Sequence, residues 1–201
     1  MKQMRRFITL IACLLLSFHA VADDEGKEWL RKADAHYKAG RYDIAVGYYL
    51  KAAEFDETEA QFNLGYALYN GEGIKQDYPS AVMWFKRAAS KQYPKAEYNL
   101  AFCYMYGKGV PCDYEKAQQL LIASANHGFA DAQITLSECY ENGILVEKNM
   151  EESKRWKSIA ENGSFTQTTE VTEDLLSATA TYDVHLDGVL RERSTLDKLR
   201  N

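Results

Sequence analysis

The stretch "YNGEGIKQD", Tyr69 to Asp77, decides how the rest of the sequence is interpreted. Its Gly71 and Gly73 form a G-x-G pattern, which also occurs in loops that hold phosphate groups. A P-loop, however, follows a β-strand and has a lysine at a helix start, and a dinucleotide-binding loop needs a third glycine. The residues before Gly71 have a helical pattern instead. We therefore expect Gly71 to end a helix in the left-handed conformation, and Gly73 to let the chain turn back.

The same pattern returns at a spacing of 36 residues, which pairs Gly71 with Gly107 and Gly143. Other positions coincide at this spacing: Ala60, Ala96 and Ala132; Leu64, Leu100 and Leu136; Asp77, Asp113 and Asn149; Trp84, Leu120 and Trp156. Repeats of about 20 to 50 residues are typical of solenoids, in which neighbouring units bury each other's apolar faces.

Each repeat has the apolar spacing of two amphipathic helices. Ala60, Leu64 and Leu68 form one stripe, and a second begins at Ala81. Asp77 is the expected N-cap of the second helix, whose first turn contains Pro79. The sequence predicts an all-α fold, a right-handed superhelical α/α solenoid of about four helix–loop–helix repeats.

These residues resemble the Sel-1-like repeat family, a relative of the tetratricopeptide repeat with a longer loop. The resemblance implies repeats at 60–95 and 96–131 and a degenerate one at 132–163. Residues 23–59 are similar to an ordinary tetratricopeptide repeat, and residues 164–201 are expected to be a linker or cap. Ala101, Ser137 and Leu145 stand where the family prefers glycine. Because terminal repeats are often atypical, we expect the array to end with the repeat at 132–163.

The first 22 residues have the pattern of a secretory signal peptide. A basic start with Lys2, Arg5 and Arg6 precedes the apolar run 7–18, and Ala20 and Ala22 suit a cleavage site. We expect a mature chain from Asp23 that is periplasmic or secreted and not stably inserted in a membrane. The alternative is a lipoprotein, because "LIAC" resembles a lipobox that ends at Cys13.

Charge and motifs restrict the function further. The net charge is −5, and residues 1–22 carry three basic residues and no acid, which argues against nucleic-acid binding. His36, His127 and His185 lie in separate regions, and neither H-E-x-x-H nor C-x-x-C occurs, so no metal or other cofactor is predicted. The resemblance also implies an alternative, because cysteine-rich members of the family bind or hydrolyse β-lactams. The S-x-x-K motif of serine β-lactamases is absent, so we expect no enzyme.

The three cysteines after the signal segment are Cys103, Cys112 and Cys139. Cys112 could pair with either of the others. Equivalent positions in stacked helices are too far apart for a Cys103–Cys139 bridge. Free, buried thiols at Cys103 and Cys139 are the remaining alternative.

The first helix of each repeat is expected to line a concave groove that binds a protein or peptide. The predicted binding residues are Tyr37, Phe62, Asn63, Tyr66, Tyr69, Tyr98, Asn99, Phe102, Met105 and Tyr106. The last repeat contributes Ile134, Glu138 and Glu141 at equivalent places. Exposed aromatic clusters usually mark recognition, and Tyr66, Phe102 and Tyr106 are the expected anchors. The alternative is that several of these side chains pack between units as core.

Overall fold

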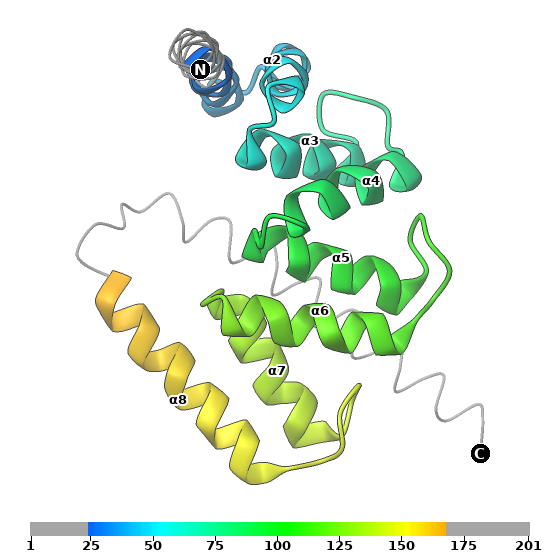
Figure 1. The fold of residues 1–201 in the computed structure, drawn as a ribbon, viewed down its shortest axis with the longest axis vertical. Coiled ribbons are helices and arrows are strands. Elements are labelled where there is room, and N and C mark those ends of the chain that lie inside the picture. The colour runs from blue at the N-terminus through cyan, green and yellow to red at the C-terminus, as the bar shows by residue number, and fades with distance from the viewer. Residues whose placement is uncertain (1–23, 168–201) are drawn as a thin grey trace, which may run out of the picture. The chain divides into compact units, whose positions relative to one another are not determined.

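The computed structural model of the protein describes residues 24–167, with side chains described to residue 163. Regular structure in this range is entirely helical, as predicted (Figure 1). A helix over residues 24–38 is followed by α2 (Tyr42–Glu54), α3 (Thr58–Asn70), α4 (Tyr78–Ala89), α5 (Pro94–Tyr106), α6 (Tyr114–Asn126), α7 (Ala130–Asn142) and α8 (Met150–Gln167). The predicted signal peptide and the chain beyond residue 167 lie outside the described residues.

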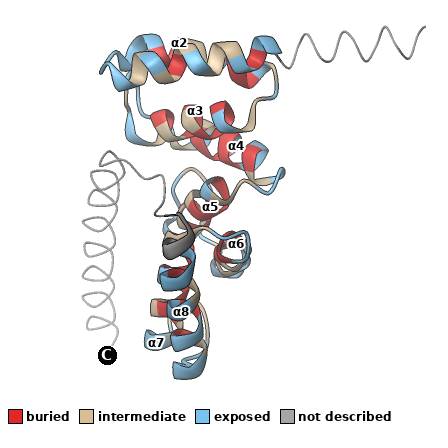
Figure 2. Cartoon of the chain, turned by 90° about the vertical axis from the view of Figure 1, so that its left-hand side faces the viewer, coloured by how far each residue is buried: buried red, intermediate tan, exposed pale blue. Residues whose placement is uncertain are grey.

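The helices form four antiparallel pairs, here called units one to four. Unit one is the helix over 24–38 with α2, and units two, three and four are α3 with α4, α5 with α6, and α7 with α8. Each helix from α2 to α7 contacts the next. Buried positions alternate with exposed ones around these helices (Figure 2). This is the all-α solenoid that the repeat predicts.

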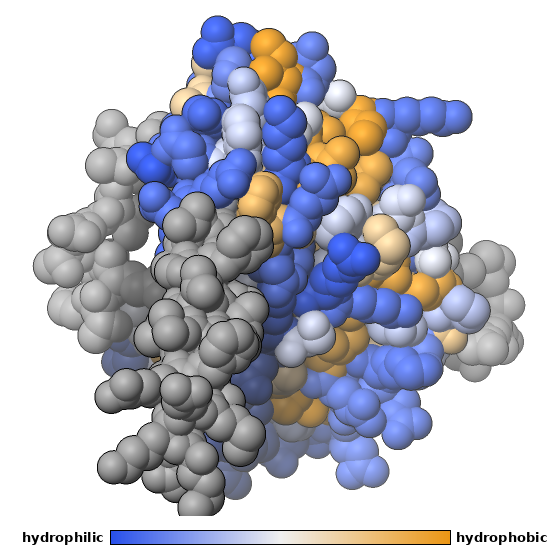
Figure 3. Space-filling model, turned by 45° about the horizontal axis from the view of Figure 1, so that its top comes forward, coloured by the Kyte–Doolittle hydropathy of each residue, from blue (hydrophilic) through white to orange (hydrophobic). Residues whose placement is uncertain are grey.

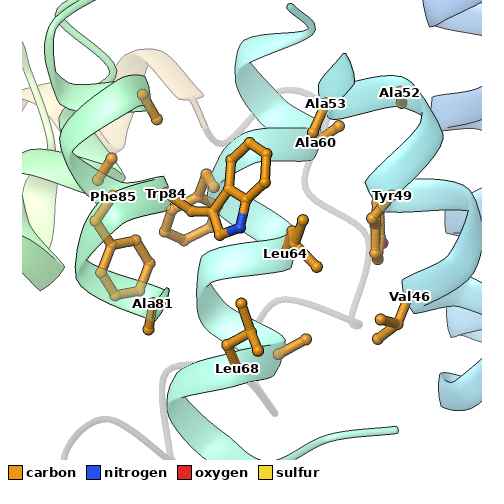
Figure 4. Packing of buried hydrophobic residues seen from close by; sticks show 14 of the residues in the cluster. Val46, Tyr49, Ala52, Ala53, Ala60, Leu64, Leu68, Ala81, Trp84 and Phe85 are labelled. Carbon is orange, nitrogen blue, oxygen red and sulfur yellow. The ribbon is translucent and has the colours of Figure 1, made fainter. Parts of the chain in front are cut away.

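The core continues from one unit into the next. Leu64 and Leu68 of α3 lie between Val46 and Tyr49 of α2 on one side and Phe85 of α4 on the other (Figure 4). Many alanines in the helices are 0% exposed, among them Ala45, Ala52, Ala60, Ala81, Ala88 and Ala96. A methyl side chain lets two helix backbones approach closely, so the repeated alanines set the spacing between helices.

The G-x-G loop is a turn between two helices, as predicted. Gly71 has φ 77°, and its N–H donates to the carbonyl of Ala67 at 2.8 Å. Gly107 and Gly143 end α5 and α7 in the same left-handed conformation. Asp77 then caps α4, because its carboxylate accepts from the Ser80 N–H at 3.2 Å.

The second glycine of the loop has a role that the sequence analysis did not assign. Gly73 has φ 69°, and a Cβ at this position would lie well under 3.0 Å from the Tyr42 backbone at the start of α2. Gly109 meets the Tyr78 backbone at the start of α4 in the same way. The loop of one unit therefore rests on the second helix of the unit before it. Only glycine permits this approach. In unit four, Leu145 takes this place with φ 62°.

The departures at Ala101 and Ser137 are explained by the facing helix. A Cβ on Gly65 would lie 2.9 Å from ring atoms of Phe85, so the large ring requires glycine. Ala101 and Leu121, both 0% exposed, hold these two positions in unit three. In unit three, the first-helix residue is larger than in unit two, and the second-helix residue that faces it is smaller. In unit four the Ser137 hydroxyl donates to the Ser153 carbonyl at 2.9 Å.

The last helix is longer than the repeat predicts. α8 ends at Gln167, four residues beyond the expected boundary at 163. Gly163 does not have the positive φ of Gly71, Gly107 and Gly143, and it lies within the helix. It therefore does not act as a C-cap, and the helix continues into the segment expected to be a linker or cap.

Candidate protein-binding face

The predicted binding residues occupy equivalent positions on successive first helices. Four of them, Tyr66 and Tyr69 on α3 and Phe102 and Tyr106 on α5, are half-buried or exposed, and we call them the aromatic strip. The other six predicted residues, which are described next, are not part of this strip. The strip is therefore narrower than the ten residues predicted from the sequence.

Phe62, Tyr98 and Met105 are buried, with 7%, 4% and 8% exposure. The Phe62 ring lies 5.4 Å from that of Tyr93, in the turn that leads to unit three. The Tyr98 ring lies 5.2 Å from that of Phe129, and its hydroxyl lies 3.2 Å from Thr135 Oγ1 on α7. Phe62 and Tyr98 pack against the turns that begin the next unit, as in the alternative of packing between units, and Met105 is buried as well.

The strip rests on these buried rings. The centroid of Phe62 lies 6.1 Å from that of Tyr66, and Tyr98 lies 4.7 Å from Phe102. Phe102 in turn lies 5.9 Å from Tyr106, which is 37% exposed. Offset and tilted aromatic pairs at these distances are favourable beyond the area that they bury. The buried rings therefore hold the strip in place.

The strip crosses the boundary between units two and three. Burial is the main cause that raises the pKa of Tyr69 to about 12, with smaller contributions from Cys103, Tyr78 and Tyr106. Tyr66 and Tyr69 lie against the rings of Phe62 and Phe85 in unit two, and Phe102 lies against Tyr98 in unit three. Each half of the strip therefore rests on the aromatic core of its own unit.

Tyr37 and the two asparagines are engaged within the protein. The Tyr37 hydroxyl donates to Glu72 Oε2 at 2.9 Å, which fastens unit one to the loop of unit two. Burial raises the Tyr37 pKa, and the hydrogen bond to Glu72 raises it further. The Asn99 side chain donates to the Lys95 carbonyl of its own helix at 2.8 Å. Asn63 is half-buried at the equivalent position of α3.

The equivalent face of α7 is acidic instead of aromatic. Glu138 and Glu141 take the positions of Phe102 and Met105, and Ile134 is 47% exposed. The Tyr98 pKa is raised mainly by burial, and Asp131 and Glu138 raise it further. Because Thr135 of α7 lies against the Tyr98 hydroxyl, this acidic face follows the aromatic face of α5 in the stack of units. Asp131 was not predicted from the sequence, although the 36-residue spacing aligns it with Lys95.

A second feature that the sequence did not reveal is a buried acid. Glu97 is 4% exposed, and its Oε2 lies 2.7 Å from Nδ1 of His127 in the turn after α6. The equivalent Gln61 donates to Asp56 Oδ1 at 2.8 Å, and Gln133 donates to the Ala125 carbonyl at 3.1 Å. Gln61 and Gln133 thus bind the chain just before their own helices, whereas Glu97 binds the turn that leads from α6 to α7. The 36-residue alignment of Glu97 with two glutamines was the signal for this structural role.

The chemistry of the described residues is limited. Within residues 24–163, no group of three or more His, Cys, Asp or Glu side chains could hold a metal ion. Cys103 and Cys139 are buried, Cys112 is exposed, and none of the three forms a disulfide within the described residues. Burial raises the pKa of Cys103 to about 12, which keeps it protonated and unreactive at neutral pH. None of the helices in the described range is long and apolar enough to cross a membrane.

The match to protein families agrees with this architecture. The model of the Sel1 repeat matches residues 34–54, 58–93, 94–129 and 130–160. The chain belongs to the Sel1 repeat family. Proteins with Sel1 repeats are generally scaffolds for protein–protein interaction, which favours protein partners. No protein with a curated description matches the chain.

Two solved structures with Sel1 repeats are similar to the chain. One is c5321, a protective antigen present in uropathogenic Escherichia coli strains, with 30% identity and a TM-score of 0.63; the match covers 68% of this chain and 30% of that one. The other is a Sel1 repeat protein from Oxalobacter formigenes, with 31% identity and a TM-score of 0.57, over 59% of this chain and 34% of that one. The chain thus spans about a third of the length of each.

Proposed function

We propose that this Sel1 repeat protein is an exported, non-catalytic adaptor that binds a protein or peptide segment along a groove lined by the aromatic strip. Tyr66, Phe102 and Tyr106 are its anchors. The observation that carries the proposal is that these side chains are half-buried or exposed on two successive first helices, while their neighbours Phe62 and Tyr98 are buried. Aromatic side chains dominate binding energy at protein interfaces.

The packing supports a binding role because it fixes the anchors before a partner arrives. Phe102 lies between the rings of Tyr98 and Tyr106, at 4.7 and 5.9 Å. Ordering a free side chain on binding costs about 0.5–1.5 kcal/mol, and a side chain that is already held avoids part of this cost. The strip therefore combines apolar area with rigidity.

Other large apolar side chains are also exposed: Ile74 lies in the loop after α3, Ile134 lies on the first helix α7, and most of the rest lie on the second helices. Figure 3 shows one face of the molecule, on which hydrophobic residues lie in separate patches among hydrophilic ones. Ile44, Met83 and Tyr114 are 41%, 44% and 54% exposed. Each lies on a different second helix, so the three serve as matched controls for the strip.

The test compares two triple variants. A partner is first identified by crosslinking in the native host and mass spectrometry, and is then purified for calorimetry. Tyr66→Ala, Phe102→Ala and Tyr106→Ala together are expected to weaken its binding at least about 100-fold, because each interface anchor contributes about 2 kcal/mol or more. Ile44→Ala, Met83→Ala and Tyr114→Ala together are expected to leave the affinity within about threefold.

Circular dichroism and thermal melting show whether both variants are folded. If the folded strip variant binds the partner as tightly as the unmodified protein, the strip is not the binding surface. If the control variant alone loses binding, the second-helix side of the molecule is the binding surface instead.

Export rests on the sequence of residues 1–22 and has its own test. Mass spectrometry of the protein from the native host is expected to find Asp23 as the first residue, in the periplasmic or secreted fraction. An intact start at Met1, or a lipid on Cys13, contradicts this part of the proposal.

A further inference from the structure

The two kinds of helix in units two to four carry opposite charge. The first helices contain five carboxylates and one basic residue: Glu59, Glu97, Asp131, Glu138 and Glu141 against Lys95. The second helices contain four carboxylates and six basic residues: Glu115, Glu151, Glu152 and Glu161 against Lys86, Arg87, Lys116, Lys154, Arg155 and Lys157. Glu97 is buried against His127, so four of the first-helix carboxylates bear on the surface.

Three of these four carboxylates lie on α7, the first helix of unit four. At the unit-four end, Glu138 takes on α7 the position that Phe102 holds on α5, and the Tyr98 hydroxyl lies 3.2 Å from Thr135 Oγ1 of the same helix. Asp131 lies in the first turn of α7, and Glu141 is exposed on its last turn. In unit two, Glu59 is exposed in the first turn of α3. The positions that continue the strip into unit four therefore carry negative charge.

Elsewhere in the molecule, lysine and arginine side chains lie over aromatic rings. Lys86 and Lys116 lie over the Tyr104 ring at 5.6 and 5.5 Å, and Arg87 lies over Trp84 at 4.6 Å. These three cations belong to second helices. Neither α3 nor α7 contains a lysine or arginine. A partner with lysine or arginine side chains would supply the cations that α3 and α7 lack.

We infer that the segment bound along the strip is basic, with lysine or arginine side chains that pair with Asp131, Glu138 and Glu141. The aliphatic stems of these side chains, or the planar guanidinium groups, pack on Phe102 and Tyr106. This inference rests on the proposed function, because it names the chemistry of the partner at the same surface. Charge complementarity of this kind increases the association rate and selects among partners.

The test uses an array of synthetic 12-residue peptides with constant aliphatic and aromatic content. Their charge runs from strongly acidic to strongly basic. The purified full chain is expected to bind the basic peptides, and binding should weaken as salt rises from 50 to 500 mM because screening shortens the range of the attraction. Two charge variants and the triple alanine variant of the strip are compared on the same array.

The charge variants remove two carboxylates each. The double variant Glu138→Gln and Glu141→Gln is expected to bind the basic peptides about three- to tenfold more weakly, which is the loss expected for two partly exposed ion pairs. Glu115→Gln with Glu151→Gln changes the net charge equally on the second helices and is expected to have no effect. Equal losses from both double variants would overturn the inference, since binding would then follow net charge alone.

The remaining outcomes separate the inference from the proposed function. If neutral or acidic peptides bind as well as basic ones and binding is lost in the strip variant, the charge inference is wrong and the proposed function stands. If basic peptides bind equally to the strip variant and the unmodified protein, both are wrong. If no peptide binds at any charge, the inference of a basic linear segment is overturned.

Discussion

Units two and three differ from unit four in how the G-x-G loop meets the rest of the molecule. Gly73 and Gly109 rest on the backbone of Tyr42 and Tyr78, at the start of the second helix of the unit before. Leu145 holds this position in unit four, and it cannot make so close an approach. The repeated glycine is thus a contact between units as well as part of a turn.

The same contrast extends to the second helices. Phe85 and Leu121 are fully buried, whereas the equivalent residue of unit four is Lys157, which is exposed. The first-helix face changes as well, from Phe102 on α5 to Glu138 on α7. These second-helix positions are therefore packed in units two and three, whereas in unit four the equivalent position is in contact with water. We expect unit four to open first.

The largest expected effect is on the alkylation of the three thiols at pH 8. Cys112 is exposed and reacts first. The equivalent Cys139 and Cys103 are buried and react only through local opening. Cys103 is expected to react slowest, about 100-fold or more slower than Cys112, because it is 0% exposed and lies in unit three, between two other units.

Mass spectrometry after timed exposure to iodoacetamide gives the three rates. Cys139 is expected to fall between the other two because unit four opens more easily. Labelling of Cys103 before Cys139 would contradict the assignment of unit four as the weaker end. Labelling in denaturant provides the control, since all three thiols then react at similar rates.

The next effect is on stability. Gly109→Ala is expected to lower the free energy of unfolding by about 2–5 kcal/mol, because the methyl group meets the Tyr78 backbone and a left-handed conformation is imposed on alanine. Gly107→Ala is the matched control. It also has positive φ, but its Cβ would lie 3.6 Å from the nearest atoms, so a loss of about 1–2 kcal/mol is expected. Urea denaturation measures the free energy of unfolding of both variants. Equal losses would show that the contact of Gly109 with the preceding unit does not contribute to stability.

A smaller effect concerns the facing pair Gly65 and Phe85. Gly65→Ala alone is expected to destabilise the protein by about 1–3 kcal/mol, because the new Cβ meets the Phe85 ring. Gly65→Ala combined with Phe85→Leu recreates the pair Ala101 and Leu121 of unit three. The double variant is expected to be about 1 kcal/mol more stable than the sum of the single changes predicts. Strict additivity in urea denaturation would show that the two positions do not share space.

The smallest effect is expected at Leu145. Leu145→Gly removes the strain of φ 62° but also the packing of a half-buried side chain. Since each contribution is about 1 kcal/mol, the free energy of unfolding should change by less than about 1 kcal/mol. A large loss in urea denaturation would mean that the unit-four loop makes a different and essential contact.

The sequence predicted the fold well because a repeat shows each structural requirement several times. Gly71, Gly107 and Gly143 together identified the helix ends, and Asp77 identified the cap. The reason for Gly73 was missed, because its neighbour is the Tyr42 backbone, and a backbone contact leaves no pattern in side-chain types. The length of α8 was not predicted, because the repeat spacing ends the last unit at residue 163, whereas the helix continues to Gln167.

The accessibility of the predicted binding residues could not be predicted from the sequence. Helical spacing places Phe62 and Tyr66 on the same face of α3, but it does not show how far the next unit covers each one. Phe62 and Tyr98 are buried by the turns that begin units three and four, through Tyr93 and Phe129. This burial depends on how the units stack, which a repeat alignment alone does not give.

The most direct test of the proposed binding face is photo-crosslinking from inside it. A benzophenone amino acid is placed at Tyr106 in one variant and at Tyr114, on the second-helix side, in another. Each variant is irradiated with the basic peptide that binds most tightly, and the product is measured by mass spectrometry. We predict a crosslink from position 106 and none from position 114. A crosslink from position 114 alone would contradict the assignment of the aromatic strip as the binding surface.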